Sequence, residues 1–206
     1  MKRRNVVPLS RFALAAARGD TAGVERAIDA ARRAGWPRAA IEETALMLTL
    51  YAGYPAAIES LRTLAERWPA ATVPRAGEVP EDERGKRGLA ALARVYGDSR
   101  PPLLRGLARL HPALANWVVE HGYGRVLARG RLDLRARELV TVTLLAAGGW
   151  ERQLASHVLG AARAGATRAE ITSQLRLGRG VSGSPAPPRA EPVLRLARTR
   201  VSRTRR

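Results

Sequence analysis

The sequence predicts an all-α protein that folds as an antiparallel helical bundle. Lys2 and Lys86 are the only lysines among 36 basic residues, so 34 are arginine, and alanine and leucine are also abundant. These residue types favour helices, whereas the aromatic residues that favour strands make up only 4% of the chain. Hydrophobic residues reach 46%, which is enough for a folded core. A β-sandwich, a β-barrel and wholesale disorder are therefore excluded.

The first part of the chain contains signals for four helices. Ser10 and Asp20 are suitable N-caps, and Gly35 suits the position just after a helix. Pro37 and Pro55 suit the first turns of the next two helices. We expect helices over residues 10–19, 20–35, 38–51 and 56–68.

A loop with three prolines and a glycine follows at residues 69–82 and is the best domain boundary. Beyond it we expect helices over residues 83–97, 101–110, 112–129, 134–147 and 151–164, then a short one that Thr167 and Glu170 begin with a capping box. A Gly/Pro loop at 178–188 precedes a last basic helix near 191–203.

An internal repeat organises these helices. Residues 9–56 align without a gap on residues 139–186, with 15 of the 48 positions identical. The matches include glycines and prolines, whose positions composition alone does not explain. The predicted map is a first repeat at 9–68, a linker at 69–82, a second repeat with the polar site at 83–177, and the Gly/Pro loop with a basic tail at 178–206.

The charge balance and the absence of cysteine limit the function. The net charge is +18, but nine arginines and one acid lie in residues 176–206, and no basic block is interleaved with aromatics. We therefore expect no nucleic-acid binding. The chain has no cysteine, which excludes thiolate chemistry and thiolate metal sites. No run of 18 apolar residues occurs, so we expect no membrane span and a cytoplasmic protein.

One polar pair distinguishes the second repeat from the first. Glu138 and His157 lie on two predicted helices separated by Gly148-Gly149, at a similar height if the helices fold back there. Trp150, Gln153 and His157 share one helix face. A carboxylate that orients an imidazole suits general acid–base catalysis. The alternative is a buried histidine held by a structural glutamate.

The stretch 111–171, with its REL run followed by RQLASHVLGAARAGAT and then E-I, resembles the carboxymuconolactone decarboxylase-like family of the alkylhydroperoxidase D-like superfamily. Residues 22–58 resemble the same domain again, which gives two tandem copies. The resemblance implies an all-α fold of two such repeats that assembles as a homo-oligomer, a trimer or a hexamer.

The resemblance also implies roles for single residues. In the alkylhydroperoxidase D branch a Glu, a CxxC pair and a His match Glu138, Trp150, Gln153 and His157 in that order, so no thiol peroxidase activity is expected. The other branch decarboxylates a carboxylated lactone without a cofactor. That chemistry needs a proton donor, for which Glu138 and His157 are the catalytic candidates.

Four further candidates would bind the small anionic substrate, namely Trp150, Gln153, Arg137 and Arg135. The expected activity is a cofactor-free lyase or isomerase acting on a small anionic lactone or carbonyl compound. The alternative is a catalytically silent oligomeric scaffold, or a basic adaptor that binds an acidic partner through its Arg-rich tail. The histidines at 111, 121 and 157 lack the spacing of zinc ligands, so no metal site is expected.

Overall fold

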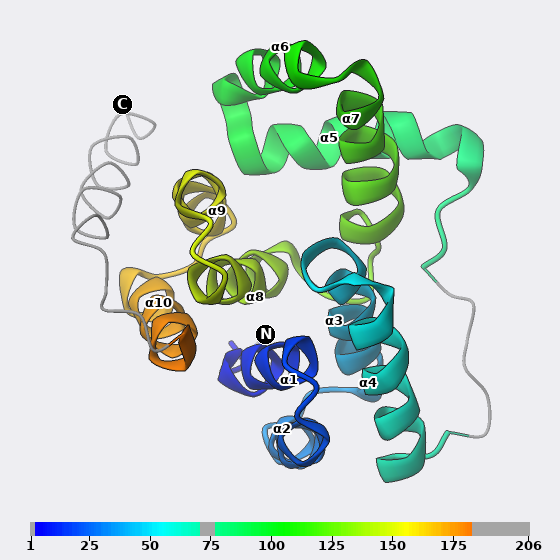
Figure 1. Cartoon of the computed structure of the whole chain (residues 1–206), viewed down its shortest axis with the longest axis vertical. Helices are drawn as coiled ribbons and strands as arrows, with labels where there is room; N and C mark the ends of the chain where they lie inside the picture. Colours follow the sequence, from blue (N-terminus) through cyan, green and yellow to red (C-terminus); the bar gives the residue numbers. More distant parts are fainter. Residues whose placement is uncertain (1–2, 71–76, 183–206) are drawn as a thin grey trace.

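The computed structural model describes residues 3–70 and 77–182. Every regular element in these ranges is a helix, which confirms the all-α prediction (Figure 1). The helices before residue 77 are α1 (Val7–Ala17), α2 (Thr21–Arg33), α3 (Arg38–Tyr51) and α4 (Gly53–Arg67). Those after it are η1 (Glu81–Glu83), α5 (Arg84–Tyr96), η2 (Gly97–Ser99), α6 (Arg100–Leu110), α7 (Pro112–Trp117), η3 (Val118–Leu127), α8 (Leu134–Ala147), α9 (Glu151–Arg163) and α10 (Arg168–Ser182).

Helix α8 is the centre of the molecule. Every residue from Ala136 to Ala146 is buried, so this helix has no face left for water. Helices α1, α3, α9 and α10 all pack against it, as their arrangement around α8 in Figure 1 illustrates. The buried apolar side chains form one cluster that extends from Val6 to Leu175. The two halves of the chain therefore share a single core around α8.

Several predicted helix signals work as expected. The Asp20 side chain accepts a hydrogen bond from the backbone N–H of Gly23 and caps α2. In the capping box of α10, the backbone N–H of Thr167 donates to Glu170 at 2.7 Å, and the backbone N–H of Glu170 donates to the Thr167 hydroxyl at 3.2 Å. These contacts need only residues close in sequence, which is why the sequence predicts them.

Two predicted boundaries are wrong. Helix α1 begins at Val7, with Pro8 in its first turn, so Ser10 is a buried residue inside the helix and not its cap. Helix α10 continues to Ser182, through the start of the predicted loop at 178. A β-carbon at Gly178 would lie 2.4 Å from the backbone oxygen of Thr143, so this glycine lets α10 approach α8 closely. The glycine serves packing here and does not end the helix.

The predicted single helix over 112–129 is two elements. Helix α7 ends at Trp117, and the chain continues as the π-helix η3. The π-helix packs along α5, and two glycines make the approach close. A β-carbon at Gly88 would lie 2.0 Å from the backbone oxygen of Val119, and one at Gly124 would lie 2.2 Å from that of Arg84.

The helix bounds repeat with the predicted offset of 130 residues. Helix α2 covers residues 21–33 and α9 covers 151–163. When 130 is added to their residue numbers, α1 falls within α8 and α3 falls within α10. The turn glycines also correspond, because Gly19 and Gly149 have φ of 69° and 70°, and Gly35 and Gly165 have φ of 75° and 88°. Both turns thus use a left-handed backbone that favours glycine.

Part of the predicted domain map cannot be compared with the fold. The predicted basic helix near 191–203 and most of the tail lie outside the described residues. Within the described ranges, no helix combines the length and the apolar character needed to cross a membrane.

We predict that Gly88→Ala destabilises the protein while Gly85→Ala does not. Both glycines lie in α5, but a β-carbon at Gly88 meets a backbone oxygen, whereas one at Gly85 has nothing within 4 Å. Forcing α5 and η3 apart should lower the free energy of unfolding by about 1–3 kcal/mol. Gly85→Ala should raise it by up to about 1 kcal/mol through helix propensity. Urea denaturation of the two variants checks this, and equal stabilities would contradict it.

Candidate functional site

Glu138 and His157 meet across the hairpin of α8 and α9, as the sequence predicts. The Nδ1 atom of His157 lies 3.0 Å from the Oε2 atom of Glu138. Gly149, with φ of 70°, makes the turn between the helices. Glu138 is 1% exposed and His157 is 6% exposed, so the pair is almost completely removed from water. We call Glu138 and His157 the dyad.

A glycine on α9 leaves room for the dyad. A β-carbon at Gly160 would lie 2.4 Å from the Oε2 atom of Glu138 and 2.7 Å from a methyl carbon of Val95. Gly160 is one turn after His157, so the carboxylate fits into the space that its missing side chain leaves. The position of Glu138 thus depends on α5 and α9 as well as on its own helix.

Three tyrosines from three other elements surround the dyad, and no pattern in the sequence indicated them. The hydroxyl of Tyr96 lies 3.5 Å from the Nε2 atom of His157, and the hydroxyl of Tyr123 lies 3.4 Å from that of Tyr96. The Tyr96 ring also packs edge-on against the rings of Tyr123 and His157, with centroids 6.1 and 6.0 Å away. We call Tyr51, Tyr96 and Tyr123 the tyrosine cluster.

Tyr51 joins the cluster from the end of α3. Its hydroxyl lies 3.0 Å from the hydroxyl oxygen of Thr141, which is one turn after Glu138 on α8. Burial raises the pKa of all three tyrosines above the usual value, and the negative charge of Glu138 raises it further. The tyrosines therefore stay protonated at neutral pH. The signal in the sequence was faint: the chain has four tyrosines, and three of them converge here.

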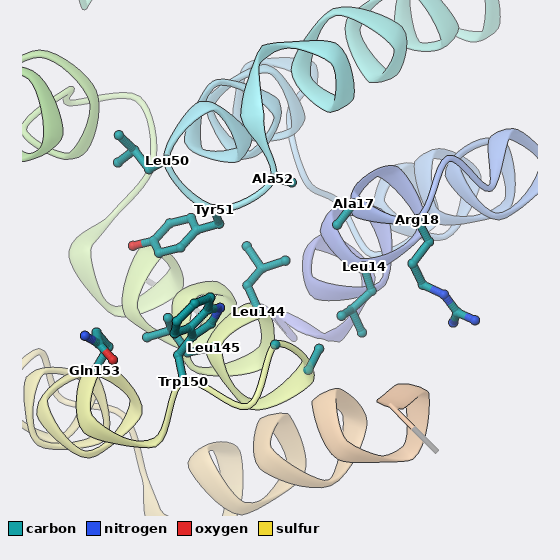
Figure 2. Close-up of a pocket in the computed structure, with 12 residues that line it drawn as sticks. Leu14, Ala17, Arg18, Leu50, Tyr51, Ala52, Leu144, Leu145, Trp150 and Gln153 are labelled. Atoms are coloured by element: carbon teal, nitrogen blue, oxygen red, sulfur yellow. The ribbon is translucent and has the colours of Figure 1, made fainter. Parts of the chain in front are cut away.

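A cavity lies beside this cluster, and Tyr51 is part of its lining. It has a volume of about 590 Å³ and an apolar wall that includes Leu14, Leu50, Leu144 and Leu145. Figure 2 shows these side chains around the space between α1, α3 and the start of α9. Such a size suits a small organic molecule.

The cavity brings together some of the predicted residues but not the dyad. Trp150 and Gln153 both line it (Figure 2), and Trp150 is 61% exposed. Glu138 and His157 do not line it. Tyr51 belongs to both places, because its ring lines the cavity and its hydroxyl contacts Thr141. Arg18 is the one charged residue in the lining.

The two predicted substrate-binding arginines lie elsewhere. The guanidinium of Arg135 donates to Glu170 at 2.6 Å and to the backbone oxygen of Arg4 at 3.1 Å. Arg137 is 1% exposed and donates to Glu43 at 2.9 Å. Neither arginine lines the cavity that Trp150 and Gln153 form. Carboxylates hold both arginines, with Glu170 pairing with Arg135 and Glu43 pairing with Arg137.

The other two histidines do not join the dyad. The Nδ1 atom of His111 accepts a hydrogen bond from the backbone N–H of Ala113 and caps α7. Burial lowers the pKa of His121, and the positive charges of Arg125 and Arg84 lower it further. Within the part of the chain that the structure describes, no three residues among His, Cys, Asp and Glu are grouped so that they could hold a metal ion.

We predict that Tyr123→Phe makes the protein less sensitive to alkaline pH. Because the folded-state pKa of Tyr123 is raised, its contribution to stability is complete below the unfolded pKa of about 10 and is lost as the pH rises through the folded pKa. Between the unfolded and the folded pKa, each such tyrosine lowers the free energy of unfolding by about 1.4 kcal/mol per pH unit.

Urea denaturation from about pH 9 to about pH 11.5 should therefore show a shallower loss of unfolding free energy for Tyr123→Phe than for the unchanged protein. Tyr54→Phe is the control, because Tyr54 is 62% exposed and lies outside the tyrosine cluster. If all three proteins lose stability at the same rate, Tyr123 does not stay protonated in the folded state.

A comparison with protein families agrees with the resemblance of residues 111–171. Residues 112–195 match the model of the carboxymuconolactone decarboxylase family. None of the curated proteins matches the chain. The matched segment covers α7 to α10 and contains both members of the dyad. The family match and the dyad together support a carboxymuconolactone decarboxylase-like protein, with residues 112–195 as the segment that carries the likeness.

Proposed function

We propose that the protein is a cofactor-free lyase or isomerase that transfers protons on a small anionic lactone or carbonyl compound. The observation that carries this proposal is the 3.0 Å contact between the Glu138 carboxylate and the His157 imidazole in a buried setting. A carboxylate in this position sets the orientation of the imidazole for proton transfer. The dyad can thus store a proton and return it.

The cavity beside Tyr51 is the proposed substrate site. Its apolar wall would exclude water from a bound carboxylate. Loss of CO2 is then favoured, because the negative charge of the carboxylate becomes spread over the larger product anion, which needs less hydration. Arg18, the charged residue of the lining, is the cation that would attract the substrate. In this proposal Arg18 binds the anionic substrate, which is the role predicted from the sequence for Arg135 and Arg137.

The proposed reaction balances without a cofactor. The bond between the substrate carbon and its carboxylate breaks, and the electron pair moves into the conjugated carbonyl to form an enolate. A proton from the dyad then reaches that carbon. Tyr51 is the proposed link between the substrate and the dyad, since it both lines the cavity and belongs to the tyrosine cluster around the dyad.

One observation favours a second function. His157 is 6% exposed, and neither member of the dyad lines the cavity, as expected if the pair only stabilises the core. The protein would then be a silent oligomeric scaffold, or an adaptor that binds an acidic partner through its basic tail. That tail lies outside the described residues.

We also propose that two tandem alkylhydroperoxidase D-like repeats build the bundle. The shared helix bounds and the corresponding turn glycines support this. In that arrangement the second repeat provides the dyad, and the first provides Tyr51 and the buried Glu43 that holds Arg137. The site then needs both copies.

We predict that Glu138→Gln and His157→Gln each lower the rate of decarboxylation of a carboxymuconolactone by about 10²–10⁴, the usual contribution of a general acid–base group. Release of CO2 measures the rate. His121→Gln is the matched control, because His121 lies outside the dyad. Circular dichroism shows whether each variant is folded.

Unchanged rates in the two dyad variants would contradict the proposed chemistry. No turnover by the unchanged protein on carboxylated lactones would favour the silent scaffold. With an organic hydroperoxide and a dithiol donor we expect no turnover, because the chain contains no cysteine.

We predict a homo-oligomer, a trimer or a hexamer. Helices α6 and α7 present large apolar side chains to solvent, with Leu110 76% exposed and Trp117 66% exposed. Apolar groups placed this way suit a contact between subunits. Light scattering at micromolar concentration measures the mass. The double variant Leu110→Glu with Trp117→Glu should have a lower mass, and a monomeric unchanged protein would contradict the prediction.

A further inference from the structure

Two neighbouring cavities at the N-terminal end of α8 are rich in arginine, whereas the substrate cavity lies at the C-terminal end of this helix. The larger has a volume of about 430 Å³, and the smaller about 330 Å³. Both have Arg94, Asp133 and Leu134 in their linings, so they adjoin one another. We call the two together the basic groove. Neither lining shares a residue with the lining of the substrate cavity, so a ligand bound in the groove would be separate from the proposed substrate.

Arginines from three parts of the fold converge on the larger cavity. Arg87 and Arg94 come from α5, Arg129 from the segment after η3, and Arg137 from α8. Arg3, Arg4 and Arg135 line the smaller cavity. Asp133 is the only acid in either lining, and its carboxylate is already used as the cap of α8, where it accepts from the backbone N–H of Ala136 at 2.8 Å.

Carboxylates outside the lining neutralise part of this charge. Glu43 pairs with Arg129 and Arg137, Glu83 pairs with Arg87, and Glu170 pairs with Arg3 and Arg135. Seven arginines thus face four acids when Asp133 is included, and the groove keeps a positive excess. Arg94, which belongs to both cavities, has no ion-pair partner among the described residues.

Arg137, which lines the larger cavity, has a buried nitrogen without an acceptor in the described part of the chain. Arg137 donates through Nε to the backbone oxygen of Leu132 at 3.2 Å and through Nη2 to Glu43 at 2.9 Å. Its Nη1 atom is buried and has no hydrogen-bond partner among the described residues. A buried donor without an acceptor is costly, and an oxyanion oxygen is the acceptor that would satisfy it.

We propose that the basic groove binds a small polyvalent oxyanion, such as a phosphate ester or a polycarboxylate. The planar guanidinium group matches the oxygens of phosphate and carboxylate with paired hydrogen bonds. The apolar residues Leu127, Leu132 and Leu134 between the arginines would contact the carbon skeleton of the ligand. The volume of the larger cavity lies in the range of small-molecule sites.

Binding of pyrophosphate and of citrate to the full chain at low ionic strength tests the proposal. Pyrophosphate represents the phosphate ligands and citrate the polycarboxylates. Isothermal titration calorimetry should show saturable binding of at least one of them, and that ligand should raise the melting temperature. The anion that binds more tightly identifies the ligand chemistry, and its binding should weaken as salt is added.

Arg94→Glu and Arg11→Glu form a matched pair of variants. Both change the net charge equally and both residues are exposed, but Arg11 on α1 does not line the groove. Arg94→Glu should weaken binding by at least about tenfold, the loss of one hydrogen bond to a charged group. Arg11→Glu should bind as the unchanged protein does.

Three results would overturn the proposal. The first is that neither pyrophosphate nor citrate binds at millimolar concentration. The second is that Arg94→Glu and Arg11→Glu weaken binding equally, which would show a general attraction to a basic protein. The third is tight binding of a single-stranded oligonucleotide that both variants weaken alike, which would show a nucleic-acid surface.

Discussion

The burial of helix α8 from Ala136 to Ala146 is the constraint on which the rest of the structure depends. Burying a polar group is costly unless it has a hydrogen-bond partner, so the polar side chains of this helix are paired with groups on neighbouring helices. Four such contacts connect α8 to its surroundings, namely Arg137 with Glu43 and Thr141 with Tyr51 on α3, Glu138 with His157 on α9, and Thr143 with Gln174 on α10. The contact that forms the dyad is therefore also one of the contacts that hold the bundle together.

The same burial separates two kinds of chemistry on one helix. Neighbouring residues on a helix point about 100° apart, so Arg137 and Glu138 face different sides of α8. Glu138 lies among protonated tyrosines near an apolar cavity, whereas Arg137 lies at the wall of the basic groove. An apolar cavity favours proton transfer on a desolvated substrate, and a groove with excess positive charge favours a polyvalent anion. The two proposals therefore concern different ligands.

The parts of the site that the sequence predicts are local, and the parts it misses join distant segments. Glu138 and His157 are 19 residues apart in one hairpin, so counting helical turns from Gly148 and Gly149 places them together. Tyr96 lies 61 residues from His157, and Glu43 lies 94 residues from Arg137. No spacing rule connects such residues. The sequence therefore predicted a polar hairpin but neither the tyrosine cluster nor the partners of the arginines.

The sequence by itself determined the helical class, most of the helix bounds and the hairpin that carries the dyad. Those features follow from helix propensity, from caps such as Asp20 and from turn glycines such as Gly149, all of which act over a few residues. Only the tertiary structure decided that Ser10 is buried inside α1 and that Arg137 is held by Glu43. Those outcomes depend on which faces become buried when the two halves of the chain pack around α8, and burial is a property of the whole assembly of helices.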